Sequence, residues 1–173
     1  DKSFKEMKSL QIRNGGNAYN SLRCRDGFMQ SLGKELGIDY QGYQPVAYYL
    51  NGKYQGLMGL RERTNDDFVF HNYGLEEDEI DLVSIKTENI SAVAGTLDAY
   101  NEMVSYVENH YADSDFYEQL SQRMDIDEYI RWQILEQFVV NTDWPGNNTK
   151  IWRKKKGGKF RWIVYDTDFG YGM

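Results

Sequence analysis

Strand-like patterns of apolar and polar residues occur in two stretches that are each interrupted by a turn signal, and each predicts a β-hairpin. In the first, residues 46–50 (VAYYL) and 53–62 (KYQGLMGLRE) flank Asn51-Gly52. This pair suits a two-residue type I′ turn, because both central positions need a positive φ. In the second, residues 149–153 and 159–165 flank a turn rich in Lys and Gly. Further strands are predicted at residues 5–13, ended by Asn14-Gly15-Gly16-Asn17, and at residues 80–86.

Apolar residues at helical spacing predict the remaining elements. Residues 25–36 form the first helix, with Gly37 as its C-cap. A short helix capped by Thr64 or Asn65 is expected to stop at Gly74. Two or three helices follow, over residues 91–111, over residues 115–123, and in a last helix capped by Asp125 or Asp127. The apolar residues of this last helix form a wide stripe, which predicts that it is well buried: Ile126, Tyr129, Ile130, Ile134, Leu135, Phe138 and Val139.

The order of these elements indicates the fold class. Strands come first, then helices, then a hairpin, which favours an α+β fold over alternating βαβ units. A chain of 173 residues is long enough for one domain with a core, so residues 1–173 are predicted to form a single domain. The chain begins on Asp1 and ends abruptly at Met173, and we expect it to be a piece of a longer protein, truncated at its C-terminal end.

Charge and composition exclude several classes of protein. The net charge of −7 disfavours nonspecific nucleic-acid binding, which needs clustered Lys and Arg. The basic run at residues 153–156 adjoins two glycines and suits a solvated hairpin tip, with a phosphate-facing role as the alternative. A single cysteine, Cys24, and two distant histidines, His71 and His110, provide neither a disulfide nor a zinc site. No apolar run is long enough to span a membrane, and no signal peptide is present.

One arrangement of residues carries chemistry. The last helix leads into a loop at residues 141–148 that contains Asp143 and, five residues later, Asn148. A hairpin follows, and then the turn Asp166-Thr167-Asp168-Phe169-Gly170. Protein kinases place a loop Asp, an Asn five residues later, and an Asp-Phe-Gly turn after the next hairpin in the same order. Each part alone is more often a plain turn, because Asn, Asp and Gly favour turns; the joint arrangement predicts phosphoryl transfer.

Alternation along the final strand suggests a neighbour for this site. Side chains alternate between the two faces of a strand, so one face of this strand carries every second residue: Phe160, Trp162, Val164 and Asp166. A metal-bound Asp166 would then lie beside two aromatic rings that could line an adenine pocket. The other interpretation is that Phe160 and Trp162 belong to the core, where buried aromatic residues usually serve packing.

These motifs resemble the spore-coat CotH kinase family. The resemblance rests on NTDWPGNN (141–148) and KFRWIVYDTDFGYG (159–172), with PVAYYLNGKYQGLMGLRE (45–62) and NDDFVFHNYG (65–74) before them, and it covers the chain from about residue 12 to its end. It implies a reduced protein-kinase-like architecture with β-hairpins and a helical segment. It also implies an enzyme that uses ATP with Mg²⁺ or Mn²⁺ to phosphorylate protein serines, and a place at the bacterial cell surface, in the spore coat or in the secreted fraction.

The resemblance also implies roles for individual residues. Asp143 resembles the catalytic Asp, and Asn148 and Asp166 resemble metal ligands, with Asp168 as a second acidic position. Glu62 matches a recurrent Glu that could pair with a phosphate-binding cation. The chain departs from ordinary kinases because it has no G-x-G-x-x-G loop and no evident V-A-I-K lysine. The residue that contacts the nucleotide phosphates is therefore open, and the candidates are Arg13, Lys53 and Lys86.

Two other functions stay open at this point. The chain could be a non-catalytic, kinase-like interaction module of a surface or coat protein that binds protein or glycan through its aromatic residues. Alternatively, its acidic residues could hold structural Ca²⁺, which accepts Asp and Asn oxygens readily. Because related proteins usually continue with further helices, loss of activity in the isolated fragment is a further alternative.

Overall fold

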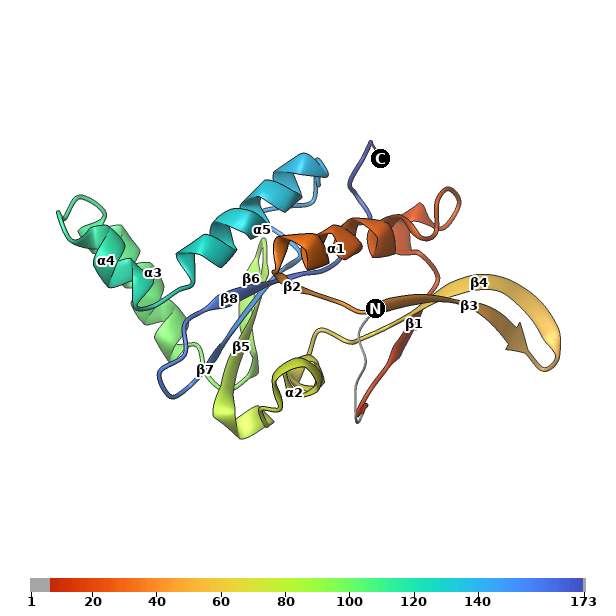
Figure 1. Cartoon of the computed structure of the whole chain (residues 1–173), viewed down its shortest axis with the longest axis horizontal. Coiled ribbons are helices and arrows are strands. Elements are labelled where there is room, and N and C mark those ends of the chain that lie inside the picture. The colour runs from red at the N-terminus through yellow and green to blue at the C-terminus, as the bar shows by residue number, and fades with distance from the viewer. Residues whose placement is uncertain (1–6, 173) are drawn as a thin grey trace.

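The computed structural model describes residues 7–172 and confirms the α+β fold (Figure 1). Its helices are α1 (Arg25–Leu36), α2 (Asp66–Tyr73), α3 (Asp98–His110), α4 (Phe116–Ser121) and α5 (Ile126–Phe138), with 3-10 turns η1 (Gly16–Ala18) and η2 (Glu77–Glu79). Its strands are β1 (Gln11–Arg13), β2 (Asp39–Tyr40), β3 (Tyr43–Leu50), β4 (Lys53–Arg61), β5 (Ile80–Lys86), β6 (Asn89–Ala94), β7 (Thr149–Lys154) and β8 (Arg161–Val164).

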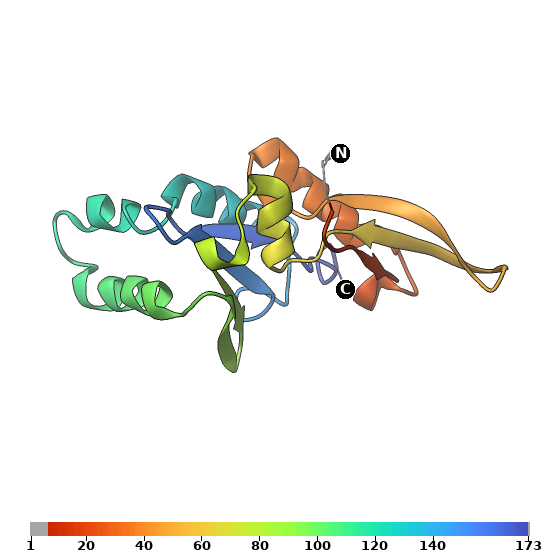
Figure 2. The same ribbon diagram turned by 90° about the horizontal axis from the view of Figure 1, so that it is seen from below.

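The larger sheet forms the centre of the molecule. Its strand order is β2-β8-β7-β5-β6, with β2 parallel to β8 and the other pairs antiparallel. Helices α1 and α5 cover one face, where Met29 and Leu135 pack with Trp162 and Val164. Helix α2 covers the other face (Figure 2). There Phe68 and Val69 of α2 pack against the sheet residues whose side chains point to that face: Ile80, Leu82, Trp152 and Ile163. Both faces are therefore buried, which explains why Trp162, Ile163 and Val164 of β8 are all apolar.

The smaller sheet, of order β1-β4-β3, carries the predicted first hairpin. Asn51 and Gly52 have φ angles of 50° and 77°, as a type I′ turn requires. The hairpin projects away from the larger sheet (Figure 1). The second hairpin, β7–β8, is also confirmed, and so is α1 with its left-handed C-cap at Gly37.

Two predicted element boundaries were wrong. The strand expected at 5–13 is only three residues long, at Gln11–Arg13; residues 5 and 6 lie outside the described part of the chain. The helix expected at 91–111 begins only at Asp98, because residues 89–94 form β6 against β5. Gly95 follows β6 with a φ of 69°, and a Cβ there would overlap the carbonyl oxygen of Ile80 and the side chain of Asp81. The close approach to β5 that this glycine permits outweighs the helical spacing of Val93.

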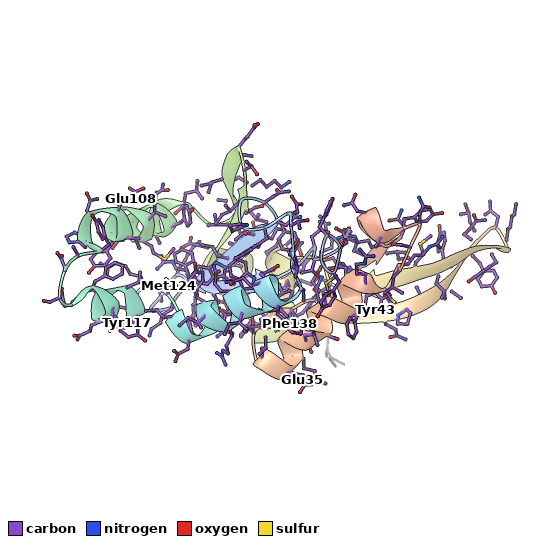
Figure 3. The ribbon with its side chains drawn as sticks, turned by 90° about the horizontal axis from the view of Figure 1, so that it is seen from above. Glu35, Tyr43, Glu108, Tyr117, Met124 and Phe138 are labelled. Carbon is purple, nitrogen blue, oxygen red and sulfur yellow. The ribbon has the colours of Figure 1, made fainter. Side chains whose placement is uncertain are left out.

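Helix α5 begins at the Asp125 cap, as predicted, but only part of its predicted apolar stripe faces the core. Leu135 and Val139 are buried, whereas Ile130 and Ile134 are half exposed and Phe138, labelled in Figure 3, is 64% exposed. The buried side consists of Glu128, Trp132, Leu135 and Glu136. A pattern of apolar residues on two sides of a helix does not show which side is covered, and here the large Trp132 ring faces the sheet.

Glu128, on the covered side of α5, is a buried carboxyl group. It is 0% exposed, and its Oε2 accepts a hydrogen bond of 3.0 Å from the backbone N–H of Trp162. Burial raises the pKa of Glu128 to about 7, against a smaller opposing effect of that N–H and of Arg161, while nearby Asp39 raises it further.

The free energy of unfolding should therefore fall as the pH rises from about 4.5 to about 7. In this window the unfolded chain has released the Glu128 proton while the folded protein holds it, so rising pH favours the unfolded state. Glu128→Gln should make the fall smaller, measured by urea unfolding at several pH values in the window. Glu108→Gln, on the exposed side of α3 (Figure 3), should follow the wild type. An unchanged slope in Glu128→Gln would contradict this assignment.

No helix within residues 7–172 combines the length and the apolar character that crossing a membrane requires.

Candidate active site

Hydrogen bonds from its own Asn side chains hold the loop at residues 141–148 in shape. The Asp143 carboxylate accepts hydrogen bonds from Asn148 Nδ2 at 2.6 Å and from Asn147 Nδ2 at 3.0 Å. The Asp143 N–H donates to Asn141 Oδ1 at 3.2 Å, and Asn141 Nδ2 donates to the buried Glu136 at 2.9 Å. Asp143 is therefore fixed at the end of α5 and keeps partial access to solvent.

The turn at residues 166–170 lies beside this loop. The Tyr171 N–H donates to the carbonyl oxygen of Val139 at 2.7 Å, and Gly170 packs against Val139 and Met29, between α5 and α1. Asp166 and Asn148 both have positive φ angles, of 54° and 52°. Left-handed backbone is unfavourable for most residues other than glycine and is concentrated at functional sites. The Thr142 hydroxyl donates to the carbonyl oxygen of Phe169 at 3.5 Å, so the loop and the turn lie side by side.

Arg13 joins the two acidic residues of the turn. Its Nη2 contacts Asp166 Oδ1 and lies 2.8 Å from Asp168 Oδ2. Asp168 also accepts the backbone N–H of Asn17 at 2.8 Å. Gly16 packs so closely that a Cβ there would overlap Asp168 and Arg13. The turn at residues 14–17, which was predicted only to end the first strand, thus forms one wall of the site.

The environment of Asp166 follows from these contacts. Burial raises the pKa of Asp166, the charge and hydrogen bond of Arg13 lower it, and Asp168 raises it again. Burial has the largest effect, so the balance is a raised pKa of Asp166. Two carboxylates directed at the same point form a site for positive charge.

A second, buried ion pair supports the turn at residues 166–170, and it was not predicted from the sequence. Asp26 on α1 is 2% exposed and contacts Arg61 of β4, which is 4% exposed. Asp26 also accepts hydrogen bonds of 2.8 Å from the N–H and the hydroxyl of Thr167. Burial favours the neutral acid, but Arg61 and hydrogen bonds from Gln30 and Thr167 hold the pKa of Asp26 below its ordinary value. The local sequence indicates this pair only through a charged residue at a core-facing position of α1 and of β4.

Lys150 lies on the α2-covered side of the larger sheet, close to the loop. Its Nζ donates to the carbonyl oxygen of Thr64 and, at 3.0 Å, to the Thr64 hydroxyl, and it lies 5.0 Å from the ring centroid of Tyr165. Burial lowers the pKa of Lys150 to about 8, and the charges of Lys86 and Arg63 add to this effect.

Several residues predicted to bind the nucleotide lie elsewhere. Phe160 and Trp162 are 1% and 7% exposed and pack in the core beneath α5, so the adenine-pocket interpretation fails and the core interpretation holds. Lys53 begins β4 at the exposed tip of the projecting hairpin, far from the loop (Figure 1). Glu62 is buried and accepts hydrogen bonds from the Gly42 N–H at 2.6 Å and from Asn72 at 2.8 Å, so it anchors α2.

The acidic pair fits a magnesium or manganese ion shared with phosphates. Such ions prefer oxygen ligands and commonly take one or two protein carboxylates, with substrate phosphates and water completing the shell. Asp166 and Asp168 converge on a cation, Arg13, which marks a position for positive charge. Within residues 7–172, no group of three or more His, Cys, Asp or Glu side chains could hold a metal ion. The donors thus suit an ion held partly by substrate rather than a closed protein cage.

Comparison with known proteins agrees with the motifs. The family model described as CotH kinase protein matches residues 1–173, the whole chain. No curated protein matches this sequence.

Proposed function

Because this chain belongs to the CotH kinase protein family, we propose that it is a metal-dependent phosphotransferase that moves the γ-phosphate of ATP to a serine of a protein substrate. The observation that carries the proposal is the position of Asp143 and Asn148 beside a turn whose carboxylates, Asp166 and Asp168, converge on a positive charge. Phosphoryl transfer depends mainly on positioning and charge neutralisation, which such a site can supply.

The chain's own residues account for the proton and the charge. Asp143 orients the serine hydroxyl and accepts its proton while the bond from the serine Oγ to the γ-phosphorus forms and the bond to the bridging oxygen of ADP breaks. Asn147 and Asn148 hold the carboxylate in one orientation. When bound, Mg²⁺ or Mn²⁺ neutralises phosphate charge, and Asn148, Asp166 and Asp168 would hold it. Arg13 neutralises the same carboxylates in the absence of the ion.

The family also bears on where the protein acts. CotH proteins are a spore-coat family, which is compatible with a coat or surface location. We propose that the protein acts in the spore coat, at the bacterial cell surface or in the secreted fraction.

The second candidate is a non-catalytic, kinase-like interaction module. The observation in its favour is the projecting hairpin, whose tip exposes Tyr49, Leu50 and Tyr54. Exposed apolar groups gathered at one place are typical of binding surfaces. This candidate predicts partner binding through the hairpin and no nucleotide binding.

Calorimetric titration of ATP, with and without Mg²⁺ or Mn²⁺, distinguishes the two candidates. For the phosphotransferase, we expect metal to strengthen ATP binding and Asp166→Ala to remove that gain, with a loss of about tenfold or more in affinity, as for other disrupted metal sites. Asp127→Ala, at an exposed position of α5, is the control and should bind like the wild type. Metal-dependent binding that persists in Asp166→Ala would show that the metal lies elsewhere. If the wild type binds no ATP but melts higher with Ca²⁺, the acidic residues hold structural calcium.

A further inference from the structure

Three cationic side chains gather beside the candidate active site. Lys150 lies on β7, Lys86 ends β5, and Arg63 lies in the segment that joins β4 to α2. Within residues 7–172, no ion pair connects any of the three to a carboxylate. In a chain of net charge −7, this is a local group of positive charges without a paired carboxylate in the described part of the chain. Because like charges repel one another, an anion bound among the three cations would be favoured.

The sheet register places these cations at the loop. Strands β5 and β7 pair Ile85 with Thr149, so the next position along β5, Lys86, comes level with Asn148. Thr87 hydrogen-bonds the carbonyl oxygen of Gly146 at 3.0 Å and ties this end of β5 to the loop. The backbone of Lys86 therefore lies level with Asn148, the residue whose side-chain amide contacts Asp143.

Lys150 is held in place rather than free in solvent. It lies opposite Ser84 on β5, and its Nζ donates to the carbonyl and hydroxyl oxygens of Thr64, the residue after Arg63. An ammonium group has three protons, so Thr64 leaves one for a ligand. Arg63 and Lys86 are both exposed and can reach the same ligand without losing a partner within the described chain.

Tyr165 connects the cations to the carboxylates. The centroid of its ring lies 5.0 Å from Lys150 Nζ. Burial raises the pKa of the Tyr165 hydroxyl to about 12, and the nearby charges of Asp166 and Asp143 add to this rise. Only the Tyr165 side chain thus separates Lys150 from the carboxylates proposed to act at the γ-phosphate. The chain has no G-x-G-x-x-G loop to surround phosphates with backbone N–H groups, so side-chain cations are the available alternative.

We propose that Lys150, Lys86 and Arg63 bind the polyphosphate chain of the nucleotide and direct its γ-phosphate toward Asp143, an inference that rests on the proposed phosphotransferase function. An extended anion with several charges suits three cations contributed by separate segments better than a single phosphate would. Lys150 and Arg63 are new assignments, whereas Lys86 was one of three candidates from the sequence.

The test compares ATP, inorganic tripolyphosphate and AMP by calorimetry on the whole chain. The variants are Lys150→Met, which keeps the volume of the buried stem, and Arg63→Gln and Lys86→Gln at exposed positions. Lys154→Met, at the exposed far end of β7, is the matched control. We expect each variant to weaken ATP and tripolyphosphate binding by about tenfold, the effect of losing a charge-assisted contact, and to leave AMP binding unchanged. Thermal unfolding confirms the fold of each variant; if Lys150→Met is unstable, the two exposed variants decide.

The outcomes separate this inference from the proposed function. If the wild type binds ATP and none of the three variants weakens it more than Lys154→Met does, the inference is overturned and the proposed function stands. If tripolyphosphate binds and the variants lose it while ATP does not bind, the anion site stands and the proposed function fails. If the variants instead lose binding of a polyglutamate peptide and keep ATP, the cations recognise an acidic protein segment and the nucleotide assignment is overturned.

Discussion

Replacing Asp143 with Asn should slow phosphoryl transfer by roughly two to four decades, the usual range for a general base or an electrostatic group. An amide has nearly the same shape as a carboxylate and can still accept hydrogen bonds from Asn147 and Asn148, so the loop should keep its structure. It can neither take the proton of the serine hydroxyl nor carry a negative charge. The loss should therefore appear in the rate of transfer and not in ATP affinity.

The measurement is transfer of labelled γ-phosphate from ATP to the chain itself and to casein as a general acceptor. Asp127→Asn, an exposed Asp to Asn change on α5, should keep the wild-type rate. Calorimetry on Asp143→Asn separates two ways of failing. A rate near that of the wild type would remove Asp143 from catalysis. A large loss of ATP affinity together with the rate would mean that Asp143 helps to hold the metal instead.

Local signals in the sequence were sufficient for most elements and for the order of the site. Asn51-Gly52 needs positive φ at both positions and so determined the first hairpin, and Gly37 ended α1 for the same reason. Asp143, Asn148 and Asp166 were predicted to form one site because protein kinases place a loop Asp, an Asn and an Asp-Phe-Gly turn in the same order. The loop and the turn flank one hairpin, and adjacent elements usually lie side by side in space.

Contacts between distant parts of the chain could not be predicted in this way. Arg13 lies 155 residues from Asp168, and Asp26 lies 141 residues from Thr167. Periodicity gives the faces of an element but not its partner on each face. For that reason the outward Ile130 and Ile134 were expected to be buried. The buried ionic groups around the turn give no periodic signal at all, and only the fold brings them together.

Removing one partner of the buried pair formed by Asp26 and Arg61 should be strongly destabilising. We expect Asp26→Ala to lower the free energy of unfolding by about 3–5 kcal/mol, the range found when one partner of a buried ion pair is removed. The change leaves the Arg61 guanidinium buried without its carboxylate and removes the acceptor of the Thr167 N–H and hydroxyl. Urea unfolding followed by circular dichroism measures the loss. Glu35→Ala, on the exposed side of the same helix (Figure 3), should change stability little.

A double replacement tests whether the charge or only the packing matters. Apolar residues of similar volume can replace a buried ion pair with little loss. Asp26→Leu combined with Arg61→Met should therefore be more stable than Asp26→Leu alone, although the Thr167 hydrogen bonds stay lost in both. If the double variant is no more stable than the single one, burial of an unpaired Arg61 is not the cause of the loss. ATP affinity of the double variant then reports on function. Asp26 supports Thr167 between Asp166 and Asp168, so a folded protein without Asp26 should bind ATP and metal more weakly.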